Sequence, residues 1–517
     1  MGASSLRPSL LLRLALLLFL AEHGVCRSYS RGDFPADFVF GAGTSAYQYE
    51  GAVDEDGRKP SIWDTFTHEG RGPHKSNGDV ASDGYHKYKE DVKLMTDIGL
   101  EAYKFSISWS RLLPDGRGVI NSKGLNYYNN VINEIFKQGI KLHVTLYHGD
   151  LPQVLQDEYG GWLNKRIVDD FKEYANVCFR EFGDRVSQWT TFAEPNIMAI
   201  AGYDNGIFAP GRCSYPFGTY GCTAGNSTTE PYIVAHNVLL THARVVELYR
   251  NTYQDNQGGQ IGINIYSMWY YPLTSSLLDL EAAERALDFM IDWCLHPLIF
   301  GDYPEIMKKN VGPRLPSFTQ EQLEIVKGSF DFISLNHYTS SFVSDNSNGS
   351  QLSQRDYFAD MFVKMGGSSN GTETDQGLPF KMLTDPLGLL RMLEHIKENY
   401  GNPPVYIEEN GYGLGGADTL ADTDRINYLS VYIGSVLDAM RNGAKVKGYF
   451  VWSLMDLFEL LSGYNSCFGL YRVNFDDEER TRVPKLSAYW YSNFLKKNIE
   501  VIDFEGFVAG EKFSATQ

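Results

Sequence analysis

One unit repeats along this chain: a helical stretch, often closed by a glycine, followed by a short apolar segment rich in β-forming residues. Eight such segments occur at similar intervals. Most of them are continuous apolar runs rather than alternating ones, which is typical of strands buried on both faces. The predicted strands are residues 38–40, 102–109, 141–148, 188–194, 260–266, 331–338, 404–409 and 446–453.

The stretches between these strands carry apolar residues at helical spacing. Gly99, Gly139, Gly183 and Gly443 follow four of them, where a helix end prefers glycine. A doubly wound open sheet is the alternative, but it usually carries a Gly-rich phosphate loop, which this sequence lacks. We therefore predict a single (β/α)8 TIM barrel with extended strand-to-helix loops over residues 27–517. Its predicted helices include residues 86–98, 125–138, 164–182, 231–253, 387–400 and 424–442.

Two regions, residues 206–230 and 341–378, are too long and polar for simple connections. Both follow predicted strands at the end where a barrel builds its active site. We expect them to shape the rim of a pocket. For the second region, a disordered surface loop is the alternative.

The start of the chain resembles a targeting segment. Arg7 precedes a leucine-rich run at residues 10–20, and small residues follow at 24–26. This pattern predicts a secretory signal peptide over residues 1–26, because the run is too short for a membrane anchor. We expect no membrane association of the mature form and a destination outside the cell, in the cell wall, or in the vacuole. In that pathway, the candidate glycosylation sites are Asn226, Asn348 and Asn370.

The cysteines and the net charge of the chain indicate which bonds and binding partners to expect. Cys213 and Cys222 lie close together in a Gly-, Pro- and Ser-rich stretch and predict one local disulfide. Cys178, Cys294 and Cys467 have apolar neighbours and are interpreted as small buried hydrophobes. There is no Cys or His pair at metal-ligand spacing, so we expect neither a metal nor another cofactor. A net charge of -18 argues against nucleic-acid binding.

Two glutamates stand at the ends of predicted strands that are far apart in the sequence. Glu194 follows one apolar strand and Glu409 follows another. Residues at the carboxyl ends of barrel strands converge on one face. Glycoside cleavage needs two carboxyl groups on either side of one bond, so this arrangement predicts a carbohydrate-active enzyme. Other polar and aromatic residues at or just beyond strand ends are Gln48, His148, Asn336, Tyr338, Trp452 and Glu459.

These segments, in this order, resemble the family 1 glycoside hydrolases, specifically the plant β-glucosidase type. The resemblance is carried by residues 38–48, 105–109, 150–153, 194–196, 409–411 and 451–454. It implies a retaining mechanism in which Glu194 is the general acid/base and Glu409 the nucleophile. Glu408 is the competing candidate, but adjacent strand residues point in opposite directions, so we expect only one of the two to face the sugar. The Asn-Gly that follows Glu409, together with the family motif, favours Glu409.

The resemblance also assigns the substrate contacts. Tyr338 is expected to hydrogen-bond the nucleophile, with Asn336 beside it. Trp452 is expected to stack on the sugar ring, and we add Phe468 to the residues that contact the substrate. The residues expected to hydrogen-bond sugar hydroxyls are Gln48, His148 and Glu459.

Four positions depart from the family pattern. Ala193 stands where the family has Asn, so a hydrogen bond to the sugar 2-hydroxyl is lost, at a cost of about a few kcal/mol in the transition state. Lys104 replaces an Arg beside the nucleophile and lacks its planar fork. Gly149 and Leu460 each replace a Trp, which predicts a wider or differently selective pocket.

The favoured hypothesis is a retaining β-glucosidase that hydrolyses aryl glucosides, alkyl glucosides or oligosaccharides through a covalent glycosyl-enzyme intermediate. One alternative is a transglucosidase that passes glucose from an acyl-glucose to a flavonoid-type acceptor. Another is a weakly active sugar-binding relative, motivated by Ala193 and Lys104. The partner is in each case a small β-glucoside or a related sugar, and the sequence makes no prediction of oligomeric state.

Overall fold

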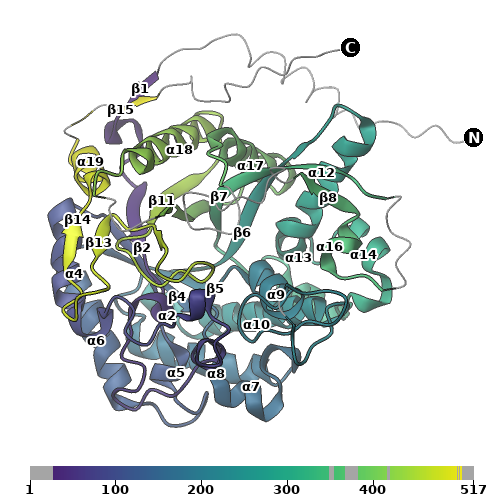
Figure 1. Ribbon diagram of the computed structural model, residues 1–517, viewed down its shortest axis with the longest axis horizontal. Coiled ribbons are helices and arrows are strands. Elements are labelled where there is room, and N and C mark those ends of the chain that lie inside the picture. Colours follow the sequence, from purple (N-terminus) through teal and green to yellow (C-terminus); the bar gives the residue numbers. More distant parts are fainter. Residues whose placement is uncertain are drawn as a thin grey trace, which may run out of the picture.

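Eight parallel strands form a closed barrel at the centre of the protein (Figure 1). The computed structural model describes residues 27–219, 221–347, 354–366, 382–415, 420–497, 499 and 501–503. Each barrel strand pairs with the next in chain order, and the last strand pairs with the first, which closes the sheet. The strands are β2 (Val39–Gly43), β3 (Ala102–Ser106), β4 (Lys141–Tyr147), β5 (Gln188–Ala193), β6 (Gln260–Pro272), β7 (Phe332–Asp345), β9 (Val405–Asn410) and β11 (Val446–Trp452). The predicted (β/α)8 fold is confirmed.

Helices surround the barrel (Figure 1). The six predicted helices are present as α4 (Gly84–Ile98), α6 (Ser122–Lys137), α8 (Ile167–Phe182), α10 (Glu230–Thr252), α17 (Pro386–Asn399) and α18 (Thr423–Arg441). Between β6 and β7 lie helices that the sequence reading did not name, α12 (Leu277–Met290), α13 (Asp292–Phe300), α14 (Glu305–Val311) and α15 (Gln320–Val326). Shorter helices on the strand-to-helix loops and at the end of the chain are α2 (Ala46–Tyr49), α3 (Ile62–His68), α5 (Trp109–Leu112), α7 (Gln153–Tyr159), α9 (Pro195–Tyr203), α11 (Gln254–Gln257), α16 (Tyr357–Met361) and α19 (Leu486–Leu495).

The glycines predicted to end helices behave in two ways. Gly99, Gly139 and Gly443 have φ of 81°, 75° and 94°, in the left-handed region that favours glycine. Gly183 also follows its helix, but its φ of -68° is right-handed. The helix α8 therefore ends there without the left-handed turn that the pattern predicts.

Two strand boundaries differ from the prediction in ways that matter for the site. The predicted strand 102–109 is too long, because β3 stops at Ser106 and the chain then turns into α5. Conversely, β6 and β7 continue past the barrel rim, pairing with each other as far as Pro272 and Val343. Strand β8 (Val363–Gly366) adds to the end of β7 in the antiparallel sense.

The long region 341–378 is therefore not a simple loop. Its described part contains the end of β7, helix α16 and strand β8. Strand extension explains the difference, because the backbone groups that leave the barrel rim on β7 are satisfied by pairing with β6 and β8. Residues 348–353 and 367–381 lie outside the described residues, and so do Asn348 and Asn370.

The other long region, residues 206–230, is irregular in its described part until α10 begins. Cys213 and Cys222 form the predicted disulfide inside it. Asn226 is exposed, as a glycosylation acceptor must be. Of the other cysteines, Cys178 and Cys294 are buried as predicted.

Cys467 is only partly buried, so its interpretation as a core residue is wrong. It lies in β12 (Ser466–Cys467), a two-residue strand that pairs with β10 (Leu414–Gly415) rather than with the barrel. Two further short sheets pair β13 (Tyr471–Val473) with β14 (Arg482–Pro484), and β1 (Arg27–Tyr29) with β15 (Val501–Asp503). Residues 1–26 lie outside the described residues. Among the residues that the structure does describe, no helix is long and apolar enough to cross a bilayer.

The inside of the barrel is filled by a small apolar cluster. Its members come from five strands and are Val39, Ala102, Phe332, Tyr406 and Phe450. Gly41 makes room for this cluster, since a β-carbon there would lie 2.4 Å from the Phe450 ring. Most of these residues lie in the N-terminal halves of their strands, so the packed interior leaves the opposite, C-terminal end of the barrel for polar side chains.

Candidate active site

Glu194 occupies the turn between β5 and α9. Its φ of 52° and ψ of 53° are left-handed, an uncommon conformation for a residue with a side chain. Two features hold the backbone there. Pro195 takes the first helical position, which suits its fixed φ, and the Glu194 N–H donates to the carbonyl oxygen of Asn264 at 3.0 Å. Strain of this kind is characteristic of functional sites.

The carboxyl group of Glu194 is set up to hold a proton. Burial and the charge of Glu409 raise its pKa to about 8, although a hydrogen bond from Asn336 and the charge of Lys104 act in the opposite direction. The Asn336 Nδ2 donates to Glu194 Oε1 at 2.8 Å. A carboxylic acid that is still protonated near pH 7 can serve as a proton donor.

Glu409 lies near the end of β9 in the opposite electrostatic situation. Its Oε1 accepts a hydrogen bond from the Lys104 ammonium group, and both side chains are buried. Its Oε2 accepts from the Tyr338 hydroxyl at 2.7 Å. One cation and one phenol therefore face the two oxygens, an arrangement that suits an ionised carboxylate. Tyr338 contacts the proposed nucleophile as the resemblance implied.

Glu408 also points into the barrel, so the premise that adjacent residues of this strand point in opposite directions does not hold. The choice of Glu409 over Glu408 as the residue that faces the sugar stays a prediction. Glu408 Oε1 accepts from Thr190 at 2.9 Å and lies 3.8 Å from His143 Nδ1. The pairing of β9 slips on both sides, against β7 and against β11, and strict alternation of side chains fails there.

The partners of Glu408 place it deeper than Glu409. The His143 ring packs 4.6 Å from Phe450 and 5.1 Å from Tyr406, which belong to the apolar cluster inside the barrel. Burial raises the pKa of Glu408, but His143, the charge of Lys104 and Thr190 outweigh it and leave that pKa below its ordinary value. Glu408 is thus a buried charge beneath the site. Within the described residues its hydrogen-bond partner is Thr190, whereas that of Glu194 is Asn336, although the charge of Lys104 acts on both glutamates.

The predicted sugar-binding residues gather beside these carboxyl groups. Trp452 Nε1 donates to Glu459 Oε1 at 3.2 Å, and the rings of Trp452 and His148 lie 6.0 Å apart. Gln48 is held in place from both ends, since it donates to the Phe458 carbonyl at 2.8 Å and accepts from Ser45 at 2.7 Å. The Gln48 side chain also hydrogen-bonds the Glu459 carboxyl group, so the two polar residues are held side by side.

Burial tunes two of these groups toward neutrality. It raises the pKa of Glu459 well above the ordinary value of a glutamate, despite the hydrogen bond from Trp452. Burial, followed by the charge of Lys104, lowers the pKa of His148 well below its usual range. Within the described residues, His148 Nδ1 is buried and has no hydrogen-bond partner. A neutral acid and a neutral imidazole can each both donate to and accept from a hydroxyl group.

An apolar wall completes the arrangement. Phe468 packs with Trp452, Leu457 and Met382, and its ring lies edge-on to Tyr338 at 6.1 Å. All nine predicted catalytic and substrate-binding residues therefore meet at the C-terminal end of the barrel. Their individual roles in binding remain predictions.

The structure also places the residues that depart from the family pattern. Ala193 is paired in register with Asn264 on the neighbouring strand. Gly149 has a φ of 85°, and a β-carbon there would lie 3.3 Å from Trp63 Nε1, so an indole from α3 already lies next to that position. Sequence reasoning missed Asn264, His143 and Thr190. Asn264 carries a detectable signal, because it is a lone amide inside the apolar run of β6.

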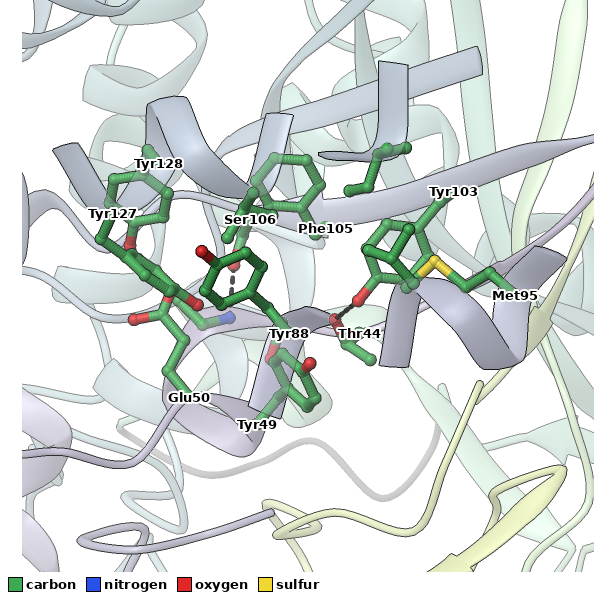
Figure 2. A pocket seen from close by; sticks show the side chains of 15 residues that line it. Thr44, Tyr49, Glu50, Tyr88, Met95, Tyr103, Phe105, Ser106, Tyr127 and Tyr128 are labelled. Atoms are coloured by element: carbon green, nitrogen blue, oxygen red, sulfur yellow. Dashed lines mark hydrogen bonds between the residues drawn. The ribbon is translucent and has the colours of Figure 1, made fainter. Parts of the chain in front are cut away.

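A small cavity lies elsewhere in the protein. Figure 2 shows it between α2, β3, α4 and α6, with Thr44, Glu50 and Tyr103 among the lining side chains. Its volume is about 20 Å³, enough for one water molecule. None of the predicted sugar-binding residues lines it. The cavity is therefore a packing defect rather than part of the site.

Comparison with known proteins agrees with this geometry. The model of glycosyl hydrolase family 1 matches residues 30–500. β-Glucosidase 22 of Oryza sativa subsp. japonica is 61% identical over 476 residues, which are 92% of this chain and 89% of that protein. A cyanidin 3-O-glucoside 7-O-glucosyltransferase (acyl-glucose) of Delphinium grandiflorum is 54% identical over 90% of this chain and 91% of its own.

A solved structure is similar over nearly the same length. A mutant rice β-glucosidase in a covalent complex with glucose superposes with a TM-score of 0.87 at 44% identity, covering 90% of this chain and 99% of its own. Family match, identity and superposition all extend across the barrel and its candidate site. The chain belongs to glycosyl hydrolase family 1, and it is a glycoside hydrolase.

Proposed function

We propose that this protein is a retaining β-glucosidase that releases terminal β-D-glucosyl residues from aryl or alkyl glucosides or from oligosaccharides. The observation that carries the proposal is the contrast between its two carboxyl groups. Glu194 has a pKa raised to about 8, whereas Glu409 is held by Lys104 and Tyr338. A carboxyl group that retains a proton, opposite a second carboxyl group held by a cation and a phenol, is the arrangement that retaining hydrolysis needs.

In the first step, a carboxylate oxygen of Glu409 attacks the anomeric carbon. Glu194 transfers its proton to the glycosidic oxygen as the bond from that oxygen to the anomeric carbon breaks. The aglycone leaves as an alcohol, and the sugar remains joined to Glu409 as an ester. Glu194 is then ionised.

In the second step, water attacks the anomeric carbon and loses a proton to the Glu194 carboxylate. The ester bond to Glu409 breaks, glucose leaves with its original configuration, and Glu194 is protonated again. Burial favours the uncharged forms of Glu459 and His148, which supports a role for both in hydrogen-bonding sugar hydroxyls, and the aromatic face of Trp452 supports its role as a platform for the ring.

Covalent trapping tests this proposal. The protein is incubated with 2-deoxy-2-fluoro-β-D-glucosyl fluoride, and the labelled peptide is identified by mass spectrometry. We expect a label on Glu409. A label on Glu408 or on any other residue would contradict the assignment, and a Glu409→Gln variant that is still labelled would do the same.

A second candidate function is transfer of glucose from an acyl-glucose to a flavonoid-type acceptor. It is favoured by the 54% identity to the Delphinium acyl-glucose-dependent glucosyltransferase. The same glycosyl-enzyme serves both reactions, and only the second acceptor differs. Incubation with an acyl-glucose and a flavonoid separates the two functions. Free glucose as the main product supports hydrolysis, and a glucosylated flavonoid as the main product supports transfer.

We also propose that the protein passes through the secretory pathway to the cell wall, the extracellular space or the vacuole. The leucine-rich segment before residue 26, the Cys213–Cys222 disulfide and the exposed Asn226 support this route. Expression in plant cells followed by peptide N-glycosidase treatment tests it. A mobility shift that is reduced in Asn226→Gln is the expected result, and an untreated chain that retains residues 1–26 would contradict it.

A further inference from the structure

Asn264 contacts the acid/base residue by two routes. It lies on β6 in the middle of an apolar run, and its side chain is completely buried. Its backbone carbonyl accepts the N–H of Glu194 at 3.0 Å, and this bond holds the left-handed turn that aims the Glu194 side chain. Its side chain reaches the Glu194 carboxyl group through Asn336.

The second route is a directed relay of hydrogen bonds. Asn264 Nδ2 donates to Asn336 Oδ1 at 2.7 Å, and Asn336 Nδ2 donates to Glu194 Oε1 at 2.8 Å. Because Asn264 presents a donor to Asn336, the Asn336 amide must turn its oxygen toward Asn264 and its NH2 group toward Glu194. Without that donor, the Asn336 amide can rotate and present its carbonyl oxygen to the carboxyl group instead.

The orientation of Asn336 decides which oxygen of Glu194 carries the proton. An oxygen that accepts an N–H is the carbonyl-type oxygen of a carboxylic acid, so the acid proton is left on Oε2. The relay is the same whether Glu194 is protonated or ionised, since Oε1 accepts in both states. Oε2 is therefore the oxygen that donates the proton in the first step and accepts it in the second.

Ala193 lies next to this relay. It is the register partner of Asn264 on β5, and it replaces the Asn that the family pattern has beside the acid/base residue. At this level of the barrel, the amide side chain therefore comes from β6 and not from β5. Asn264 Oδ1 has no hydrogen-bond partner within the described residues, which agrees with the absence of an amide at position 193.

We propose that Asn264 is a positioning residue for Glu194, acting through Asn336 to keep the catalytic proton on Oε2. This inference rests on the proposed function, because it assumes that Glu194 is the acid/base. Besides the relay, the charges of Glu409 and Lys104 act on Glu194, and Glu194 in turn acts on Tyr266 and Tyr338. Substitution of Asn264 leaves all of them in place.

The test compares two substrates that differ in their need for a proton. An alkyl β-glucoside requires protonation of its leaving oxygen, whereas a 2,4-dinitrophenyl β-glucoside does not. In Asn264→Leu we expect kcat/KM for the alkyl glucoside to fall roughly tenfold or more, the usual worth of a hydrogen bond to a charged group. For the dinitrophenyl glucoside, kcat/KM should change by less than about threefold, because general acid catalysis contributes little there.

The pH profile gives a second readout. The hydrogen bond from Asn336 opposes the rise in the pKa of Glu194, so its loss should move the basic limb of kcat/KM to higher pH. Asn264→Asp has the same shape as the native residue, and its ionised form lacks the donor but adds a negative charge that by itself raises the pKa of Glu194. For this variant, therefore, only the ratio of the two substrates is compared, at a pH above the pKa of the new carboxyl group. Asn264→Asp serves if Asn264→Leu does not fold.

Asn237→Leu is the matched control. Asn237 is also a buried amide, and its Nδ2 donates to the Trp162 carbonyl at 2.8 Å, away from Glu194. We expect it to lower stability without changing the ratio of the two substrates or the pH profile. Equal losses on both substrates in the Asn264 variants, or behaviour like that of Asn237→Leu, would overturn the proposed role.

A titration without turnover keeps the two proposals separable. The Glu194 carboxyl group is followed by 13C NMR, with Glu194→Gln as the assignment control, and its pKa should rise in Asn264→Leu, which adds no charge. If the wild-type protein cleaves neither substrate, the proposed function fails, and the titration alone decides whether Asn264 acts on Glu194. An unchanged titration would overturn the inference about Asn264.

Discussion

The ammonium group of Lys104 forms a buried ion pair with the carboxylate of Glu409. Lys104 comes from β3 and Glu409 from β9, so the pair joins two strands that are far apart in the chain. The same ammonium lies 5.4 Å from the ring centre of Trp452, the predicted sugar platform. One cation therefore links the proposed nucleophile to the surface on which the sugar ring is expected to stack.

Removal of the Lys104 charge should damage stability as well as activity. In Lys104→Met, the Glu409 carboxylate stays buried without its cation, which we expect to cost about 3–5 kcal/mol of unfolding free energy. Lys104→Arg retains the charge, so its loss should be clearly smaller. Urea unfolding of both variants measures the difference. Equal destabilisation by Met and Arg would show that packing, rather than charge, is what Lys104 supplies.

Glu194→Gln should remove acid catalysis and leave the nucleophile intact. We expect kcat/KM for an alkyl β-glucoside to fall by roughly 10²–10⁴, the usual contribution of a general acid. Formation of the glycosyl-enzyme from 2,4-dinitrophenyl β-glucoside should fall much less, and a burst of dinitrophenol should appear because the base needed for the second step is also missing. Stopped-flow absorbance measures the burst. Unchanged turnover of the alkyl glucoside would remove Glu194 from its role.

The rate of hydrolysis should depend on pH through the titration of Glu194. Glu194 must be protonated to act as an acid, and its pKa is raised to about 8 by burial and by Glu409. The value of kcat/KM for an alkyl glucoside should therefore fall as the pH rises through about 8. In Glu194→Gln that basic limb should disappear from the residual activity. A limb that persists unchanged would have to belong to another group.

The free energy of unfolding should also fall as the pH rises, because of Glu194. The folded-state pKa of Glu194 lies above its ordinary value of 4.5, so the folded protein binds an extra proton between about pH 4.5 and 8. Its contribution to stability is complete below that window and is lost as the pH rises through it, by at most about 1.4 kcal/mol per pH unit. Glu194→Gln should become more stable than the wild type as the pH increases. Thermal unfolding at a series of pH values compares the two proteins.

Ala193→Asn should restore a contact that the family pattern has and this chain lacks. If the new amide reaches the sugar 2-hydroxyl, kcat/KM for a β-glucoside should rise about tenfold relative to the 2-deoxy-β-glucoside, a modest part of the several kcal/mol that such contacts supply. Ala193→Leu fills the same space without a donor and should not change that ratio. A ratio that is unchanged in Ala193→Asn would mean that the amide pairs with Asn264 instead.

Much of this architecture could be predicted because barrel strands and helices have simple local signals. Continuous apolar runs and helical spacing located all eight strands and six of the helices. The helices between β6 and β7 and the extension of β7 toward β8 were missed. The extension depends on pairing between residues that are distant in the chain, and no local pattern reports it.

The site shows the same division at the level of single residues. The sequence alone singled out Glu194 and Glu409 as candidates, because both stand at the ends of predicted strands and in segments that resemble the family pattern. It also identified the unusual neighbours Ala193 and Lys104. The sequence could not show that both adjacent glutamates lie inside the barrel, because a slip in the pairing of β9 turns Glu408 inward as well.

Tertiary structure alone decided how these groups act on one another. The raised pKa of Glu194 depends on burial and on the charge of Glu409, which is more than two hundred residues away. The link from Asn264 through Asn336 to Glu194 joins three strands or strand ends. Hydrogen bonds and charge interactions act over a few ångströms of space rather than along the chain, so the residue types were set by the sequence and their protonation and orientation by the fold.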